Sequence, residues 1–94
     1  WHTGGRALSA KAANPGLSAV ERQQYQALCE GIDSLSETLR TTLVLVCVDG
    51  LSHEEASSVL GAPEGTIAWR VHEARRKLRA FMASRGYALD GDES

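Results

Sequence analysis

The segment from about Glu64 to about Ala83 constrains the fold of this chain more than any other part. Its apolar residues recur at intervals of three and four, at Ile67, Val71, Ala74, Leu78 and then Phe81. Residues with that spacing share one face of an α-helix. Because most of the remaining positions are polar or charged, the segment predicts a long amphipathic helix whose apolar stripe packs against a core.

A first helix is expected over about residues 18–32. Ser18, followed three residues later by Glu21, matches a capping box, and Gly31 weakens the prediction towards the end of the segment. The residues expected to face the core are Val20, Leu28 and Ile32.

A second helix is expected to begin at Ser36 and to end at Asp49-Gly50, where the glycine suits the left-handed position after a helix. The run Leu43-Val44-Leu45-Val46-Cys47-Val48 is also β-prone, so a buried strand is the competing interpretation. The spacing from Leu35 onward favours a helix, and the chain has no second strand-like run to pair with it.

A short third helix and a turn precede the long helix. Ser52 and Glu55 match a second capping box, Gly61 ends the segment, and Pro63 lies at or next to the first position of the long helix, where its missing N–H costs nothing. The residues expected to face inward are Ala56, Val59 and Leu60. Four helices with short connections predict an all-α fold, a small four-helix bundle.

The ends of the chain differ in composition from its centre. Residues 1–16 contain three glycines and a proline and are expected to be a linker or tail, residues 17–84 the domain, and residues 85–94 an acidic tail. No apolar run approaches the roughly 20 residues that span a bilayer, and no signal peptide opens the chain, so we expect a cytoplasmic protein. Because the chain begins with Trp1 rather than Met, we expect it to be part of a longer protein.

Metal and catalytic sites are not expected. Cys29 and Cys47 have no C-x-x-C spacing and fall inside helical patterns, so we expect reduced thiols in the core. His2, His53 and His72 lack the spacing of metal ligands. No nucleophile, base and orienting group come together, so neither enzymatic activity nor a cofactor nor a small-molecule substrate is expected.

Charge is distributed unevenly. Residues 1–63 hold four basic and seven acidic side chains, residues 64–85 hold six basic and two acidic ones, and residues 86–94 add three acidic ones. The net charges of the three parts are therefore −3, +4 and −3. Such a basic stripe is either a solvated helix face or the site of an anionic partner.

The short third helix, the turn at Gly61 and the basic fourth helix together predict a helix-turn-helix of the three-helix, homeodomain-like class. The face of the long helix opposite its apolar stripe holds Gly65, Trp69, His72 and Arg76. It is small at its start, aromatic in the second turn and basic afterwards. This order suits DNA, since residues near the start of a recognition helix reach base edges and later arginines reach phosphates.

Residues 35–82 resemble region 4 of bacterial sigma factors of the extracytoplasmic-function group. The resemblance rests on Leu35-Ser36-Glu37, on Asp49-Gly50-Leu51-Ser52-His53-Glu54-Glu55-Ala56 and on the string E-G-T-I-x-x-R-V-H-x-A-R-x-x-L that begins at Glu64. It implies a module that reads the minus-35 promoter element, docks on the flap of the RNA polymerase β subunit and is held inactive by an anti-sigma factor. Residues 17–33 would be its first helix.

The positions where the family reads DNA correspond to Pro63, Glu64, Gly65, Thr66, Ala68, Trp69 and Arg70. Phosphate contacts are expected from His72, Arg75 and Arg76, and the helix end at Ser52 can also donate to a phosphate. The chain departs from the family at Ala68-Trp69, where a lysine and a small polar residue are frequent. Trp69 is therefore open to three interpretations: a DNA contact, an anchor for a protein partner, or incidental exposure.

Two other functions remain open. The chain could be the helix-turn-helix output domain of another transcription regulator, of the kind found in quorum-sensing response regulators. It could also be a sigma-like decoy whose fourth helix binds an anti-sigma factor and no DNA.

Overall fold

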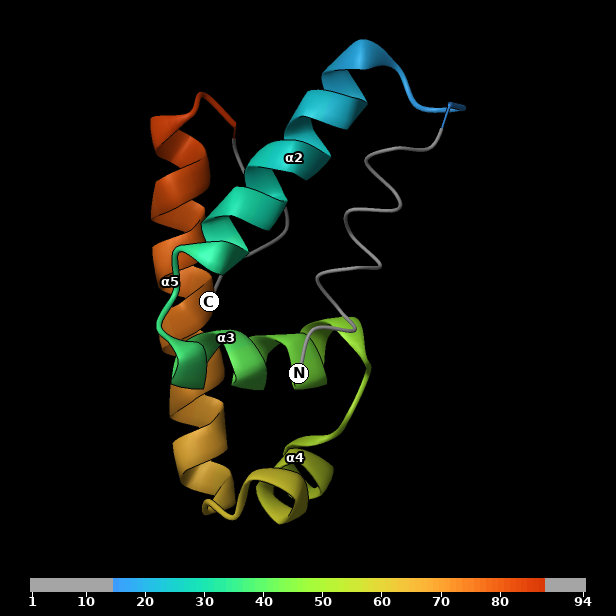
Figure 1. The fold of residues 1–94 in the computed structure, drawn as a ribbon. Coiled ribbons are helices and arrows are strands. Elements are labelled where there is room, and N and C mark those ends of the chain that lie inside the picture. Colours follow the sequence, from blue (N-terminus) through green and yellow to red (C-terminus); the bar gives the residue numbers. More distant parts are fainter. Residues whose placement is uncertain (1–14, 88–94) are drawn as a thin grey trace.

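The computed structural model describes residues 15–87, and this part of the chain is helical with no strand (Figure 1). Its elements are α2 (Ala19–Asp33), α3 (Glu37–Leu43), the π-helical segment η1 (Val44–Val48), α4 (His53–Leu60) and α5 (Glu64–Ser84). The predicted all-α fold is confirmed, and the alternative of a strand at residues 43–48 is wrong. The predicted tails fall largely on residues 1–14 and 88–94, which lie outside the described range.

The helices α2, α3 and α4 begin where their serines predict. The Glu21 N–H donates to Ser18 Oγ over 3.1 Å, and the Ser18 N–H donates back to Glu21 Oε1 over 3.1 Å. Ser52 and Glu55 make the same pair of bonds, over 3.0 and 2.8 Å. At α3, Ser36 Oγ accepts from the Leu39 N–H. Each serine thus satisfies a backbone donor that a helix start otherwise leaves unpaired.

Helix α5 is the common support of the fold, because α2, α3 and α4 all pack against it (Figure 1). The larger core cluster, around the C-terminal half of α5, contains Ala27, Ile32, Leu35, Leu39, Leu43, Val44, Ala74, Leu78 and Met82. The smaller cluster, around its N-terminal half, contains Ala56, Ile67 and Val71. The predicted apolar stripe of α5 therefore faces inward along most of the helix.

Gly31 allows α2 to lie directly against α5. A Cβ at this position would lie 2.6 Å from Leu78 Cδ1 and 2.8 Å from Phe81 Cδ1. Both distances are shorter than carbon atoms tolerate without displacement. The glycine that weakens the helix prediction is thus the residue that this close packing requires.

The segment η1 departs from the α-helix expected up to Asp49. The Asp49 N–H donates to the Val44 carbonyl, five residues back, over 2.9 Å, and the Leu51 N–H donates to the Leu45 carbonyl over 2.9 Å. The wider turn buries Val44 and Leu45 and leaves Cys47 exposed. The expectation of core cysteines is therefore wrong, since Cys47 is exposed and Cys29 is only half-buried.

Two valines expected in the core are exposed. Val20 is 65% exposed because α2 meets α5 through its C-terminal half, and its first turns diverge from α5 (Figure 1). Val59 is 62% exposed because the short helix α4 turns a narrow strip towards α5, with Ala56 buried and Leu60 half-buried. Helical spacing defines a face, but the length of the neighbouring contact decides how much of that face is covered.

Candidate nucleic-acid interface

The turn between α4 and α5 has the geometry that a helix-turn-helix requires. Gly61 has φ +68°, the left-handed conformation that favours glycine, and its N–H donates to the Ser57 carbonyl over 2.9 Å. Ser57 Oγ donates to the Ala62 carbonyl. Pro63 then caps α5 through its carbonyl, which accepts from the Ile67 N–H over 3.0 Å. The turn is therefore fixed by its own hydrogen bonds.

Packing of α4 on α5 decides which side of α5 faces outward. Ala56 of α4 and Ile67 of α5 are both completely buried, and Val71 lies beside them. With this stripe inside, the opposite side of the helix, which we call the outward face, holds Gly65, Trp69, His72 and Arg76. All four are exposed, and Trp69 is 61% exposed. The predicted orientation of α5 is confirmed.

Ten of the eleven residues proposed for DNA binding lie along the cap and first four turns of α5. Pro63, Glu64 and Arg75 are exposed together with the outward face, whereas Thr66, Ala68 and Arg70 are half-buried at its borders. Ser52 lies apart from them at the start of α4, where its hydroxyl already accepts the Glu55 N–H. A serine hydroxyl keeps its own proton to donate, so a phosphate contact there stays possible.

Glu73 and Arg76 form a bidentate ion pair on α5. Arg76 Nη2 donates to Glu73 Oε2 over 2.7 Å, and Arg76 Nε donates to Glu73 Oε1 over 3.0 Å. The hydrogen bond from Arg76 lowers the pKa of Glu73, and the same bond raises the pKa of Arg76. The spacing of three residues on a helix is the sequence signal that predicts such a pair.

The N-terminus of α5 differs from those of the other helices because Pro63 offers no side-chain hydrogen bond to it. The first backbone N–H groups of a helix have no partner within the helix, and the helix dipole adds positive potential there. This end of α5 therefore favours an anion.

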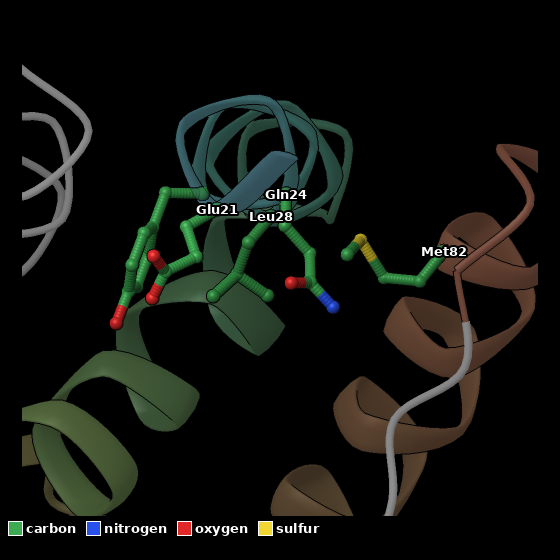
Figure 2. Close-up of a pocket in the computed structure, with 5 residues that line it drawn as sticks. Glu21, Gln24, Leu28 and Met82 are labelled. Atoms are coloured by element: carbon green, nitrogen blue, oxygen red, sulfur yellow. The ribbon is translucent and has the colours of Figure 1, made fainter. Parts of the chain in front are cut away.

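A groove of about 230 Å³ lies between α2 and the C-terminal end of α5 (Figure 2). It is lined by Glu21, Gln24, Tyr25, Leu28 and Met82. Glu21 belongs to the cap of α2, and Met82 belongs to the larger core cluster. The groove is thus a consequence of how α2 crosses α5, and it lies away from the outward face.

Other kinds of site find no support among the described residues. No group of three or more His, Cys, Asp or Glu side chains in residues 15–87 is placed to hold a metal ion. In the same range, no helix combines the length and apolar composition needed to cross a membrane.

Comparison with known proteins gives a consistent set of relatives. The family described as "Sigma-70, region 4" matches residues 25–78. The chain is 40% identical over 52 residues to "ECF RNA polymerase sigma factor SigE" of Mycolicibacterium smegmatis, a match that covers 55% of this chain and 20% of that protein. It is 37% identical over 71 residues to "ECF RNA polymerase sigma factor EcfG" of Rhodopseudomonas palustris, covering 74% of this chain and 38% of that one.

A third relative is the "ECF RNA polymerase sigma-E factor" of Escherichia coli K12. It is 33% identical over 66 residues, which cover 70% of this chain and 35% of the relative. The chain therefore spans only about a fifth to two fifths of the length of these relatives. No solved structure gives a significant match.

Proposed function

This chain belongs to the sigma-70 region 4 family, and we propose that it directs transcription initiation by recognising the minus-35 element of promoters while it docks on RNA polymerase. In this role it acts in the bacterial cytoplasm, where promoters and polymerase are found. Its chemistry is recognition, and we propose no catalytic step.

The observation that carries the proposal is the outward face of α5. The turn at Gly61 and the packing of Ala56 on Ile67 fix the orientation of this face, which is small at its start, aromatic in the second turn and basic afterwards. A helix presented in this way enters the major groove with its N-terminal residues at base edges. We propose that Glu64, Gly65, Thr66, Ala68, Trp69 and Arg70 lie at the bases, with Pro63 at the entry.

Phosphate contacts supply most of the affinity and carry no sequence information. We propose that His72, Arg75 and Arg76 make them from the later turns of α5, together with Ser52 at the start of α4. The N-terminus of α5, which has no hydrogen bond from a capping side chain, adds a further donor for a phosphate.

Polymerase docking uses a surface other than the outward face, because both partners are held at the same time. The family resemblance makes the flap of the β subunit the expected docking element. An anti-sigma factor that covers either surface would keep the module inactive.

The experiment begins by enriching duplexes that bind the 94-residue chain from a randomised library, with and without a fragment containing the β-subunit flap. Fluorescence anisotropy then compares the enriched duplex with a scrambled one at several salt concentrations. We expect Arg75→Ala to reduce the salt slope by about 0.9, the value for one phosphate contact. Arg22→Ala, which removes the same charge from α2, should leave the slope unchanged.

Failure to enrich any sequence, with or without the flap fragment, would contradict promoter recognition. Binding of an anti-sigma factor under those conditions would then favour the decoy function, for which the exposed Trp69 is the structural reason.

A further inference from the structure

Trp69 lies at the centre of the outward face. It belongs to the second turn of α5, and the buried residues Ile67, Val71 and Ala74 occupy the opposite side of the helix. Trp69 is 61% exposed. The other large apolar side chains exposed in the described part of the chain are Val20 and Val59, and both are smaller than an indole. An indole in this position is accessible to an apolar group that comes to it from outside.

The surface next to Trp69 is open. Side chains on a helix lean towards its N-terminus, so a residue covers the surface over the turn that precedes it. The residue one turn before Trp69 is Gly65, and a Cβ built there would meet nothing within 4 Å. The flanking residues Thr66 and Ala68 are short and half-buried. Trp69 therefore presents a flat apolar surface beside open space at Gly65, at the end of α5 that we propose to read bases.

We propose that Trp69 selects a thymine by packing against its C5-methyl group in the major groove. This inference rests on the proposed function and adds the chemical group that is read. The methyl is the apolar group that a thymine presents in the major groove, and an indole carries one donor and no acceptor, so it cannot make the paired contacts that select guanine or adenine.

The net charge of the helix that carries Trp69 favours DNA over a protein as the partner. Residues 64–85 carry six basic and two acidic side chains, so this segment stays cationic although Arg76 pairs with Glu73 and Arg85 pairs with Glu30. The cores of protein–protein interfaces are depleted in charged residues, whereas a cationic surround suits a polyanion. The aromatic ring and the arginines of the same helix thus fit a single ligand that has both an apolar group and phosphates.

The test removes one methyl group from the DNA and the indole from the protein. In the enriched duplex, each thymine is replaced in turn by deoxyuridine, which lacks only the C5-methyl. We expect the wild-type chain to lose about four-fold in affinity at one position, the equivalent of one buried CH₂ group. Trp69→Ala should bind the parent duplex more weakly and should be insensitive to deoxyuridine at that position.

Two variants serve as controls. Trp69→Phe keeps an apolar ring and should retain part of the methyl effect. Val59→Ala trims another exposed apolar residue. When deoxyuridine replaces the thymine at that position, this variant should lose about the same four-fold in affinity as the wild type.

The outcomes separate this inference from the proposed function. If specific binding is found but deoxyuridine weakens the wild type and Trp69→Ala equally at every position, the inference is wrong and promoter recognition stands. The same holds if Trp69→Ala binds the parent duplex as tightly as the wild type, which would leave a protein contact or incidental exposure as the interpretation of Trp69. If no sequence is enriched at all, both proposals fall.

Discussion

Arg76 faces outward on α5 with two of its donor nitrogens already bonded to Glu73. An arginine with a paired carboxylate contributes less to the attraction of phosphates than its formal charge suggests, because the two charges nearly cancel at a distance. At the scale of single residues, the charge that α5 offers to DNA therefore depends on Glu73 as much as on the arginines.

Replacing Glu73 tests this balance. Glu73→Gln removes the negative charge beside Arg76, and we expect tighter binding to any duplex, with a salt slope steeper by up to about 0.9. The ratio of specific to non-specific affinity should fall, since phosphate contacts carry no sequence information. Anisotropy titrations with enriched and scrambled duplexes measure both quantities. Glu37→Gln on α3 is the matched control, and an equal effect of both variants would show that only net charge matters.

The same pair predicts a dependence on pH. The pKa of Glu73 lies below its ordinary value of 4.5, chiefly because Arg76 donates hydrogen bonds to the carboxylate. A lowered pKa in the folded state means that the pair stabilises the fold above pH 4.5 and that this contribution is lost as the pH falls through the pKa of Glu73. We expect Arg76→Ala to raise the pKa of Glu73 towards 4.5, as followed by carboxyl NMR shifts. An unchanged pKa would rule out the pair in solution.

At the scale of helices, the two glycines of α2 and α5 have different roles. Gly31→Ala would place a Cβ against Leu78 and Phe81, and we expect a net loss of about 1 kcal/mol, since overpacking costs more than the gain in helix propensity. Gly65→Ala enters open space, and we expect a gain of about 0.5 kcal/mol. Chemical denaturation of both variants measures the change in the free energy of unfolding. Stabilisation by both substitutions would contradict the close contact between α2 and α5.

The starts of the helices could be predicted from the sequence because a cap is a local contact. Ser18 and Ser52 bond to residues three positions away, so the pattern of residue types suffices. The exposure of Val20 and Val59 could not be predicted in this way, because it depends on where α5 ends its contact with α2 and α4. The wide turn at η1, where the Asp49 N–H donates to the Val44 carbonyl, likewise departs from the α-helix that the sequence predicts there.

The candidate site was predictable for a related reason. The apolar stripe of α5 defines the opposite face of the helix by its spacing alone. The outward position of Trp69 and Arg76 could therefore be predicted from the sequence. The open surface at Gly65 and the engagement of Arg76 by Glu73 required the structure, since both depend on side-chain positions.

At the scale of the whole molecule, α5 runs through both core clusters, and η1 also contributes to both, with Val44 in the larger cluster and Val46 packed against the smaller one. Ala56 of α4 covers its N-terminal half, whereas Leu39 of α3 and Ile32 of α2 cover its C-terminal half. A single helix that spans both clusters couples them, because neither half of α5 can unfold without exposing apolar residues of the adjoining half. The turns of α5 that we propose to read DNA are therefore supported by packing at both ends of the helix.

This coupling predicts how the domain responds to a small defect under the N-terminal half of α5. Ile67→Val removes one buried methylene from the smaller cluster and should lower the free energy of unfolding by about 1 kcal/mol. If α5 couples the clusters, the slowest-exchanging amides of α2 and α4 should lose protection by the same factor in native-state hydrogen exchange. Val59→Ala, at an exposed position of α4, should leave both unchanged. Faster exchange confined to α4 would instead show that the two clusters unfold independently.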